Sequence, residues 1–237
     1  IYAMDEVNFL PGVSRKVRVI GRRGVKNTYQ MSGGERTSLT VMAPICADGS
    51  YLFPTVIFKG KGMLKKWREN NPLPAQGYTN NLLTRSWIEH FDKDTQDKDP
   101  GAKRVLVFDV HRTHYNLPLL TYSIDHNISI LGYTPKTTAL CQTQDVVLFS
   151  PLKTAYDDVR VRWKDVHKQS VRVENFLEIY ATAHRATFTK DNILEAFKKT
   201  GLVPFNPDVI PESAMAPSKE LSIHGGFPVQ PPAPVRA

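Results

Sequence analysis

The sequence has few of the features that mark secreted, membrane or zinc-binding proteins. Its two cysteines, Cys46 and Cys141, show no metal-ligand spacing, and we interpret them as reduced thiols in an intracellular protein. No apolar run approaches the roughly 18 residues that are needed to cross a bilayer. A hydrophobic content of 41% with 23% charged residues is that of a globular chain, so the sequence as a whole is not disordered.

Acidic residues are scarce between Arg15 and Arg68. This stretch holds twelve Lys and Arg residues against two acids, an excess of ten in a chain whose net charge is +8. A basic block of this size suits a polyanion such as nucleic acid, and the alternative is a solvated basic face with no partner. The candidate DNA contacts are Arg15, Lys16, Arg18, Arg22, Arg23, Lys26, Lys59 and Lys61.

Apolar and β-branched runs predict strands along the first 133 residues. The Asp48-Gly49 pair predicts a hairpin turn between two of them. The predicted strands are 1–10, 37–46, 51–59, 105–108 and 128–133.

Helical spacing of apolar residues dominates the rest of the chain. Thr79 is a candidate N-cap for a helix through Phe91, and Thr189 is one for a last helix that ends at Gly201. Pro151 must begin a helix or kink one that has already begun. Further helices are predicted at 117–126, from 145 onward, and at 174–183.

Three aspartates follow predicted buried segments at places where α/β sheets carry reactive groups. They are Asp5, Asp109 and Asp145. Taken singly, each is more often a loop residue or a helix cap. Together, they would offer hard oxygen ligands to Mg²⁺ or Mn²⁺, and two such ions suit phosphoryl transfer.

Three neighbouring side chains could support such a site. His111 and His114 could orient a water molecule or contact a phosphate, and the alternative is that both are polar loop histidines. Glu6 could support the metal ligands without binding the metal itself, and the alternative is that it is a simple loop acid.

Several stretches resemble one family. They are Met4-Asp-Glu-Val-Asn-Phe, Gly12-Val-Ser-Arg-Lys-Val-Arg-Val-Ile-Gly, Ile45-Cys-Ala-Asp-Gly, Val56-Ile-Phe-Lys-Gly-Lys, Trp87-Ile-Glu-His-Phe, Val105-Leu-Val-Phe-Asp-Val-His, Asp145-Val-Val-Leu-Phe-Ser-Pro-Leu-Lys and Asn192-Ile-Leu-Glu-Ala-Phe-Lys-Lys-Thr-Gly-Leu-Val-Pro-Phe-Asn-Pro. With them the chain resembles the DDE superfamily endonuclease domain of pogo/Tigger/Jerky-type transposases, to which centromere protein B is related.

The resemblance implies an α/β, ribonuclease-H-like fold. Its mixed five-stranded sheet would have three antiparallel strands followed by parallel ones, with flanking helices. It also implies a nuclear enzyme that cleaves and transfers DNA strands, with Asp5, Asp109 and Asp145 holding Mg²⁺ or Mn²⁺, and a homodimer on DNA. The catalytic domain would cover residues 1–207, followed by a proline-rich, disordered tail over 208–237. End recognition in this family usually belongs to helix-turn-helix domains upstream.

The chain departs from the family pattern beside two of the aspartates. Val110 stands where the family commonly has Gly after the second aspartate, and a β-branched residue is costly if that position needs a positive φ. Ala139 replaces a His, and Thr143-Gln144 replace Pro-Leu before the third aspartate.

Three functions are therefore open. The first is a two-metal DNA transposase core, which the retained triad favours. The second is a domesticated, catalytically inactive DNA-binding or architectural protein of the centromere protein B type, which the departures favour. The third is a metal-dependent nuclease acting on RNA, but nothing in the sequence indicates a reader of the 2′-hydroxyl group.

Overall fold

The computed structural model describes residues 1–13, 37–58, 71–79, 83–98, 100–109, 117–133 and 138–210. The strands are β1 (Tyr2–Met4), β2 (Glu6–Phe9), β3 (Leu39–Met42), β4 (Ile45–Cys46), β5 (Thr55–Phe58), β6 (Gln76–Thr79), β7 (Arg104–Phe108) and β8 (Ile128–Gly132). The α-helices are α1 (Leu83–Thr95), α2 (Leu117–Asp125), α3 (Thr138–Cys141), α4 (Thr143–Val147), α5 (Phe149–His167), α6 (Phe176–Thr187) and α7 (Lys190–Lys199). Two 3₁₀ helices are η2 (Val173–Asn175) and η3 (Pro207–Val209).

Two strand lines of the sheet are each interrupted at one place. β1 and β2 follow one another with a break at Asp5, and β3 and β4 follow one another with a break at Ala43-Pro44. The backbone N–H of Ala43 donates to the carbonyl oxygen of Asp5 at 3.1 Å, so the two breaks lie side by side. The hydrogen-bonded strands thus form two four-stranded sheets, β4-β1-β7-β8 and β2-β3-β5-β6.

The order and direction of the strands confirm the predicted ribonuclease-H-like fold. β2 pairs with β3 and β3 with β5 in antiparallel fashion, whereas β1 pairs with β7 and β7 with β8 in parallel. An additional edge strand, β6, pairs in parallel with β5. The prediction that Thr79 caps a helix was wrong, because Thr79 ends β6 and the helix begins at Leu83.

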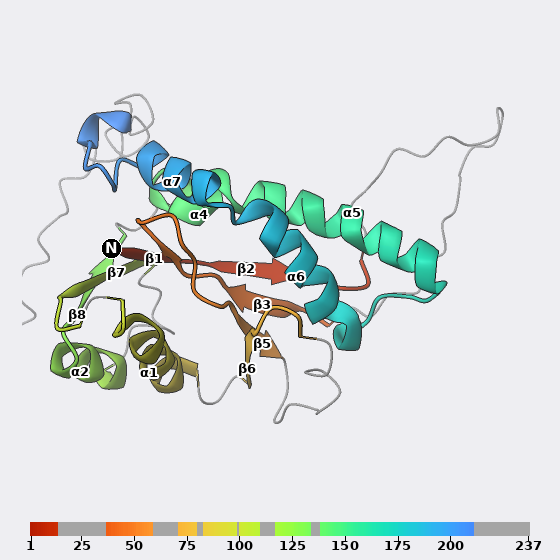
Figure 1. Cartoon of the computed structure of the whole chain (residues 1–237), viewed down its shortest axis with the longest axis horizontal. Helices are drawn as coiled ribbons and strands as arrows, with labels where there is room; N and C mark the ends of the chain where they lie inside the picture. The colour runs from red at the N-terminus through yellow and green to blue at the C-terminus, as the bar shows by residue number, and fades with distance from the viewer. Residues whose placement is uncertain are drawn as a thin grey trace, which may run out of the picture.

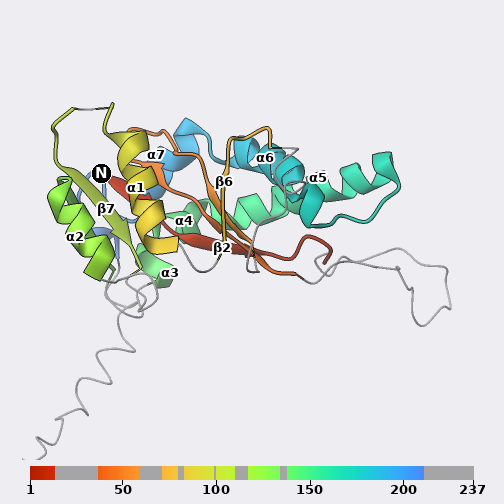
Figure 2. The same cartoon turned by 90° about the horizontal axis from the view of Figure 1, so that it is seen from below.

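Each face of the sheet is covered by its own set of helices (Figures 1 and 2). Strand side chains alternate between the faces, as the two-residue period of a strand requires. Ala3, Val7 and Phe9 join one core cluster with residues of α5, α6 and α7. Tyr2 and Met4 join a second cluster with residues of α1 and α2. Among the described residues, no helix has the length and the apolar character that crossing a membrane requires.

Local signals in the sequence account for the turn and for two helix boundaries. Gly49 adopts a φ of +87° in the hairpin turn, where the N–H of Cys46 donates to the carbonyl oxygen of Ser50 at 2.8 Å. Thr189 caps α7 by accepting a hydrogen bond from the N–H of Asn192 at 3.3 Å. Pro151 lies in the first turn of α5, directly after α4 has ended. These predictions are confirmed.

Candidate active site

Asp5 and Asp109 follow two strands that are paired in parallel. In that pairing Met4 is aligned with Phe108, so the next residue of each strand line is one of the aspartates. Asp5 falls between Ala3 and Val7 in the alternation, on the face of the sheet that α4 to α7 cover. Continuing the alternation of β7 places Asp109 on the same face, because Phe108 packs on the opposite one.

Asp145 reaches this edge from the short helix α4. The residue before it, Gln144, is fully buried and donates from Nε2 to the carbonyl oxygens of Ala3 at 2.8 Å and Ala43 at 3.1 Å. Thr143 is also buried, and its hydroxyl lies 3.2 Å from the hydroxyl of Tyr133 at the end of β8. α4 is therefore joined to the sheet on both sides of the place where Asp5 stands.

The carboxyl group of Asp5 is buried and incompletely hydrogen-bonded. Its Oδ1 accepts a hydrogen bond from the N–H of Glu6 at 2.7 Å, and its Oδ2 is buried with no hydrogen-bond partner. Burial raises the pKa of Asp5 to about 7 against the lowering effect of that hydrogen bond, and the negative charges of Asp145, Glu6 and Asp109 raise it further. The strand pairing and the contacts of α4 thus bring the three predicted aspartates toward one edge of the sheet, where the charges of Asp109 and Asp145 act on Asp5.

The surroundings of Asp145 differ from those of Asp5. Its side chain is exposed, yet partial burial raises the pKa of Asp145, while the positive charge of Lys153 in the first turns of α5 lowers it. On the other side of the edge, burial raises the pKa of Tyr133, hydrogen bonds with Thr143 lower it, and the charge of Asp5 raises it again. Asp145 thus feels the positive charge of Lys153, whereas the charges that act on Asp5 from the described residues are negative.

The donor set at this edge fits a hard divalent cation. Carboxylate oxygens are the ligands that Mg²⁺ and Mn²⁺ prefer, and the partnerless Oδ2 of Asp5 is a ligand atom that no protein group satisfies. Among the described residues, however, no three His, Cys, Asp or Glu side chains lie close enough together to form a ready-made metal cluster. The assignment of Asp5, Asp109 and Asp145 as metal ligands therefore stays a prediction.

Other predicted site residues are only partly placed. Glu6 begins β2 beside Asp5, and its charge contributes to the raised pKa there. His111, His114 and Val110 lie outside the described residues. The same holds for the basic candidates Arg15, Lys16, Arg18, Arg22, Arg23, Lys26, Lys59 and Lys61.

In the sequence, Thr143 and Gln144 stand out only as departures from the family pattern. The structure shows instead that both carry hydrogen bonds that attach α4 to the sheet. The signal that could have revealed this role is the pair of polar residues at positions that the family fills with Pro and Leu. Tyr133, the partner of Thr143, carries no such signal.

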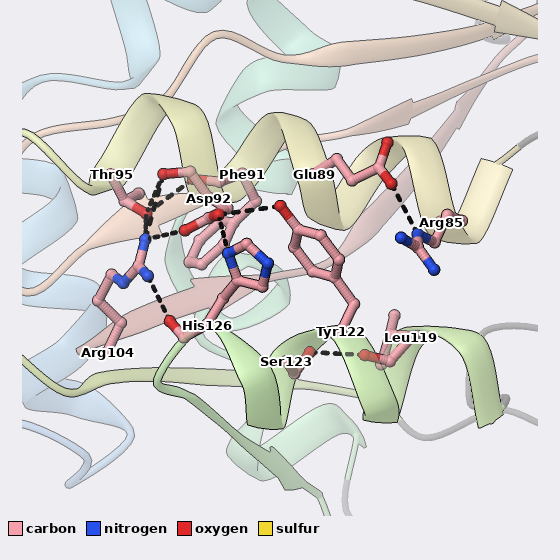
Figure 3. A network of polar contacts seen from close by, with 10 residues as sticks. All are labelled: Arg85, Glu89, Phe91, Asp92, Thr95, Arg104, Leu119, Tyr122, Ser123 and His126. Atoms are coloured by element: carbon pink, nitrogen blue, oxygen red, sulfur yellow. Dashed lines mark hydrogen bonds and ion pairs between the residues drawn. The ribbon is translucent and has the colours of Figure 1, made fainter.

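A second buried aspartate lies on the opposite face of the sheet, between α1, β7 and α2 (Figure 3). Asp92 is 6% exposed, and its carboxylate contacts Arg104 at 2.6 Å, His126 at 2.7 Å and the Tyr122 hydroxyl at 2.9 Å. Burial alone would raise the pKa of Asp92, but hydrogen bonds from Arg104 and Tyr122 and the charge of Arg104 lower it overall. Arg104 also donates to the hydroxyl of Thr95 at 2.9 Å and to the carbonyl oxygen of His126 at 2.6 Å.

The sequence matches the model of one protein family. The model of the DDE superfamily endonuclease family matches residues 35–197. A curated protein from Cochliobolus lunatus, named MFS-type transporter clz9, is 32% identical over 220 residues. That match covers 89% of this chain and 24% of the relative, so the chain spans about a quarter of that protein, and the transport in its name refers to that protein.

Solved structures of a transposase resemble the chain more distantly. The Mos1 transposase paired-end complex with left transposon end has a TM-score of 0.46 and 12% identity, over 87% of this chain and 55% of the Mos1 chain. The mariner Mos1 paired end complex with Mg has a TM-score of 0.44 and 13% identity, over 86% and 55% of the two chains.

Proposed function

Because the chain belongs to the DDE superfamily endonuclease family, we propose that it cleaves and transfers DNA strands by metal-dependent phosphoryl transfer at the edge formed by Asp5, Asp109 and Asp145. The observation that carries the proposal is the buried Oδ2 of Asp5, which has no hydrogen-bond partner among the described residues, while the charges of Asp145 and Asp109 act on the same carboxyl group. Burying an ionised carboxylate without a partner costs several kcal/mol even after the protein relaxes, so such a group shifts its pKa toward the neutral form. Perturbed carboxyl groups of this kind concentrate at functional sites.

In such a site, some residues of the chain bind the metal ions and another binds the DNA. Asp5 and Asp109 supply oxygen ligands from paired strand ends, and Asp145 supplies them from α4. Two divalent ions, when bound, would activate the attacking oxygen and stabilise the leaving oxygen of the phosphodiester. Lys153 is exposed and its charge acts on Asp145, so its ammonium group is placed to bind a phosphate of the DNA.

The nicking of supercoiled plasmid DNA tests this function. We expect the protein to nick the plasmid in Mg²⁺ or Mn²⁺ and to stop when EDTA removes the metal. Asp109→Asn should lower the rate at least about hundredfold, since an electrostatic stabiliser of the transition state is typically worth that much. Asp125→Asn, a change of an exposed aspartate on α2, is the matched control and should nick at the wild-type rate.

The alternative is a domesticated DNA-binding or architectural protein without catalysis. The absence of a ready-made cluster of three metal ligands among the described residues favours it. Retained DNA binding with no nicking in either metal would support this alternative and contradict the proposed cleavage. Nicking that survives in Asp109→Asn would contradict the assignment of the site.

A further inference from the structure

We propose that Gln144 is a positioning residue, which docks α4 onto the break in the sheet and thereby holds Asp145 beside Asp5. The role in metal binding rests on the function proposed above, whereas the docking itself does not. Gln144 has no place in the chemistry of the reaction, because its side chain is fully buried and its Nε2 donates to two backbone carbonyls, while its Oε1 is buried with no hydrogen-bond partner among the described residues.

The orientation of the Gln144 amide follows from its partners. Both neighbours, the carbonyls of Ala3 and Ala43, are acceptors, so only the NH₂ end of the amide can satisfy them. Ala43 precedes Pro44, whose nitrogen carries no hydrogen and cannot donate to a sheet ladder. The side chain of Gln144 therefore supplies a donor to backbone acceptors at the point where the ladder is interrupted.

The two carbonyl groups belong to the two strand lines that lie side by side at Asp5. Ala3 lies two positions before Asp5 on the same strand line, and the N–H of Ala43 donates to the carbonyl oxygen of Asp5. The buried amide of Gln144 thus joins both strand lines to α4, in which Asp145 is the next residue. The Thr143–Tyr133 contact joins the same helix to the end of β8. Since α4 has only five residues, these contacts and its packing must hold it in place, because helices this short are not stable alone.

A leucine at this position could fill the space but could not bond to either carbonyl. In this chain, the position of Asp145 relative to Asp5 therefore depends on a polar contact. Groups that orient metal ligands typically change metal affinity by about 10–100-fold when they are replaced.

The test compares Gln144→Met, which keeps the length of the side chain and removes its donors, with Leu148→Met. Leu148 is buried at the end of α4, so this control introduces the same residue without removing a side-chain hydrogen bond. The first measurement is amide hydrogen exchange of Val146 and Leu148, whose N–H groups donate to carbonyls of residues 142 and 144. We expect about tenfold faster exchange in Gln144→Met and no change in the control.

The second measurement is a titration with Mn²⁺ alone, followed by electron paramagnetic resonance. Gln144→Met should raise the Kd for Mn²⁺ about tenfold. In an Asp145→Asn background the same change should have no further effect on Mn²⁺ binding, because Gln144 acts through Asp145. Thr143→Val, which removes the second attachment of α4, provides another test by the same exchange measurement if Gln144→Met does not fold.

The outcomes separate this inference from the proposed function. Faster exchange with weaker Mn²⁺ binding that depends on Asp145 supports the positioning role. Unchanged exchange, or an equal loss of Mn²⁺ affinity with and without Asp145, overturns it. If the wild-type protein binds no Mn²⁺, the proposed function fails, and the exchange rates alone decide whether Gln144 docks α4.

Discussion

Two buried aspartates on opposite faces of the sheet have opposite surroundings. Asp92 has an arginine, a tyrosine and a histidine around its carboxylate, and its pKa is lowered. Asp5 has one backbone donor and three carboxylates nearby, and its pKa is raised to about 7. The partners of a buried carboxyl group, rather than its burial alone, therefore decide whether its pKa rises or falls.

Strand β7 connects the surroundings of Asp92 with those of Asp5, because its last residue, Phe108, is paired with Met4. Arg104, which bonds to Asp92, is the first residue of that strand, and Asp109 directly follows its end. The satisfied network therefore fixes one end of a strand whose other end carries a predicted metal ligand. Mutations of Asp92 and Asp5 should have opposite effects on stability.

The largest expected effect is a loss of stability when Asp92 is removed. Asp92→Ala leaves Arg104 buried without its counter-ion, and breaking a buried pair in this way costs about 3–5 kcal/mol. Urea unfolding of the two proteins measures this change. Asp125→Ala, at an exposed position, should stay within about 0.5 kcal/mol of wild type. A cost below that of the exposed control would remove Asp92 as an anchor of β7.

The second effect is a gain of stability at the other aspartate. The folded pKa of Asp5, about 7, lies above its ordinary value of 3.8, so the folded protein binds the proton more tightly than the unfolded chain. Stability that is present below about pH 4 is lost as the pH rises toward 7. Asp5→Asn should therefore be more stable than wild type by about 2–4 kcal/mol at pH 8 without metal, and equally stable near pH 4.

Urea unfolding at several pH values, with EDTA present, tests this prediction. An Asp5→Asn variant that is less stable than wild type at pH 8 would show that the Asp5 carboxylate is satisfied after all. The comparison between the two aspartates would then lose its basis.

The smallest effect separates the hydroxyl groups beside the two aspartates. Tyr122→Phe removes a hydrogen bond to a charged carboxylate and should cost about 1.5–3 kcal/mol. Tyr133→Phe removes a longer contact between two neutral hydroxyls and should cost about 0.5–1.5 kcal/mol. Thermal unfolding of both variants gives the ranking, and a larger loss for Tyr133→Phe would contradict it.

The sequence was informative wherever a local pattern determines local structure. Short apolar runs predicted the strands that precede Asp5 and Asp109, and Asp48-Gly49 predicted the hairpin turn after β4. Because paired parallel strands end at one edge, the meeting of these two aspartates could be expected from order alone. The cap at Thr189 was predictable for the same local reason.

The remainder depends on contacts between residues that are distant along the chain. The partners of Asp92 lie 12 to 34 positions away and follow no periodic spacing, so no pattern connected them. Gln144 meets Ala3 across 141 positions, and only the folded sheet shows that its amide has carbonyls to bind. The sequence analysis did not anticipate the break at Asp5 either, since it predicted one strand over residues 1–10.

The partnerless oxygen of Asp5 also bears on how this chain can evolve. While the site is in use, selection on the reaction keeps an aspartate that makes the metal-free fold less stable. Once that selection ends, replacement of Asp5 by a neutral residue becomes a stabilising mutation, and nothing then keeps the aspartate in place. Asp5 would thus be replaced early in a copy that has lost its catalytic activity, whereas Asp92 would be kept as long as the protein folds.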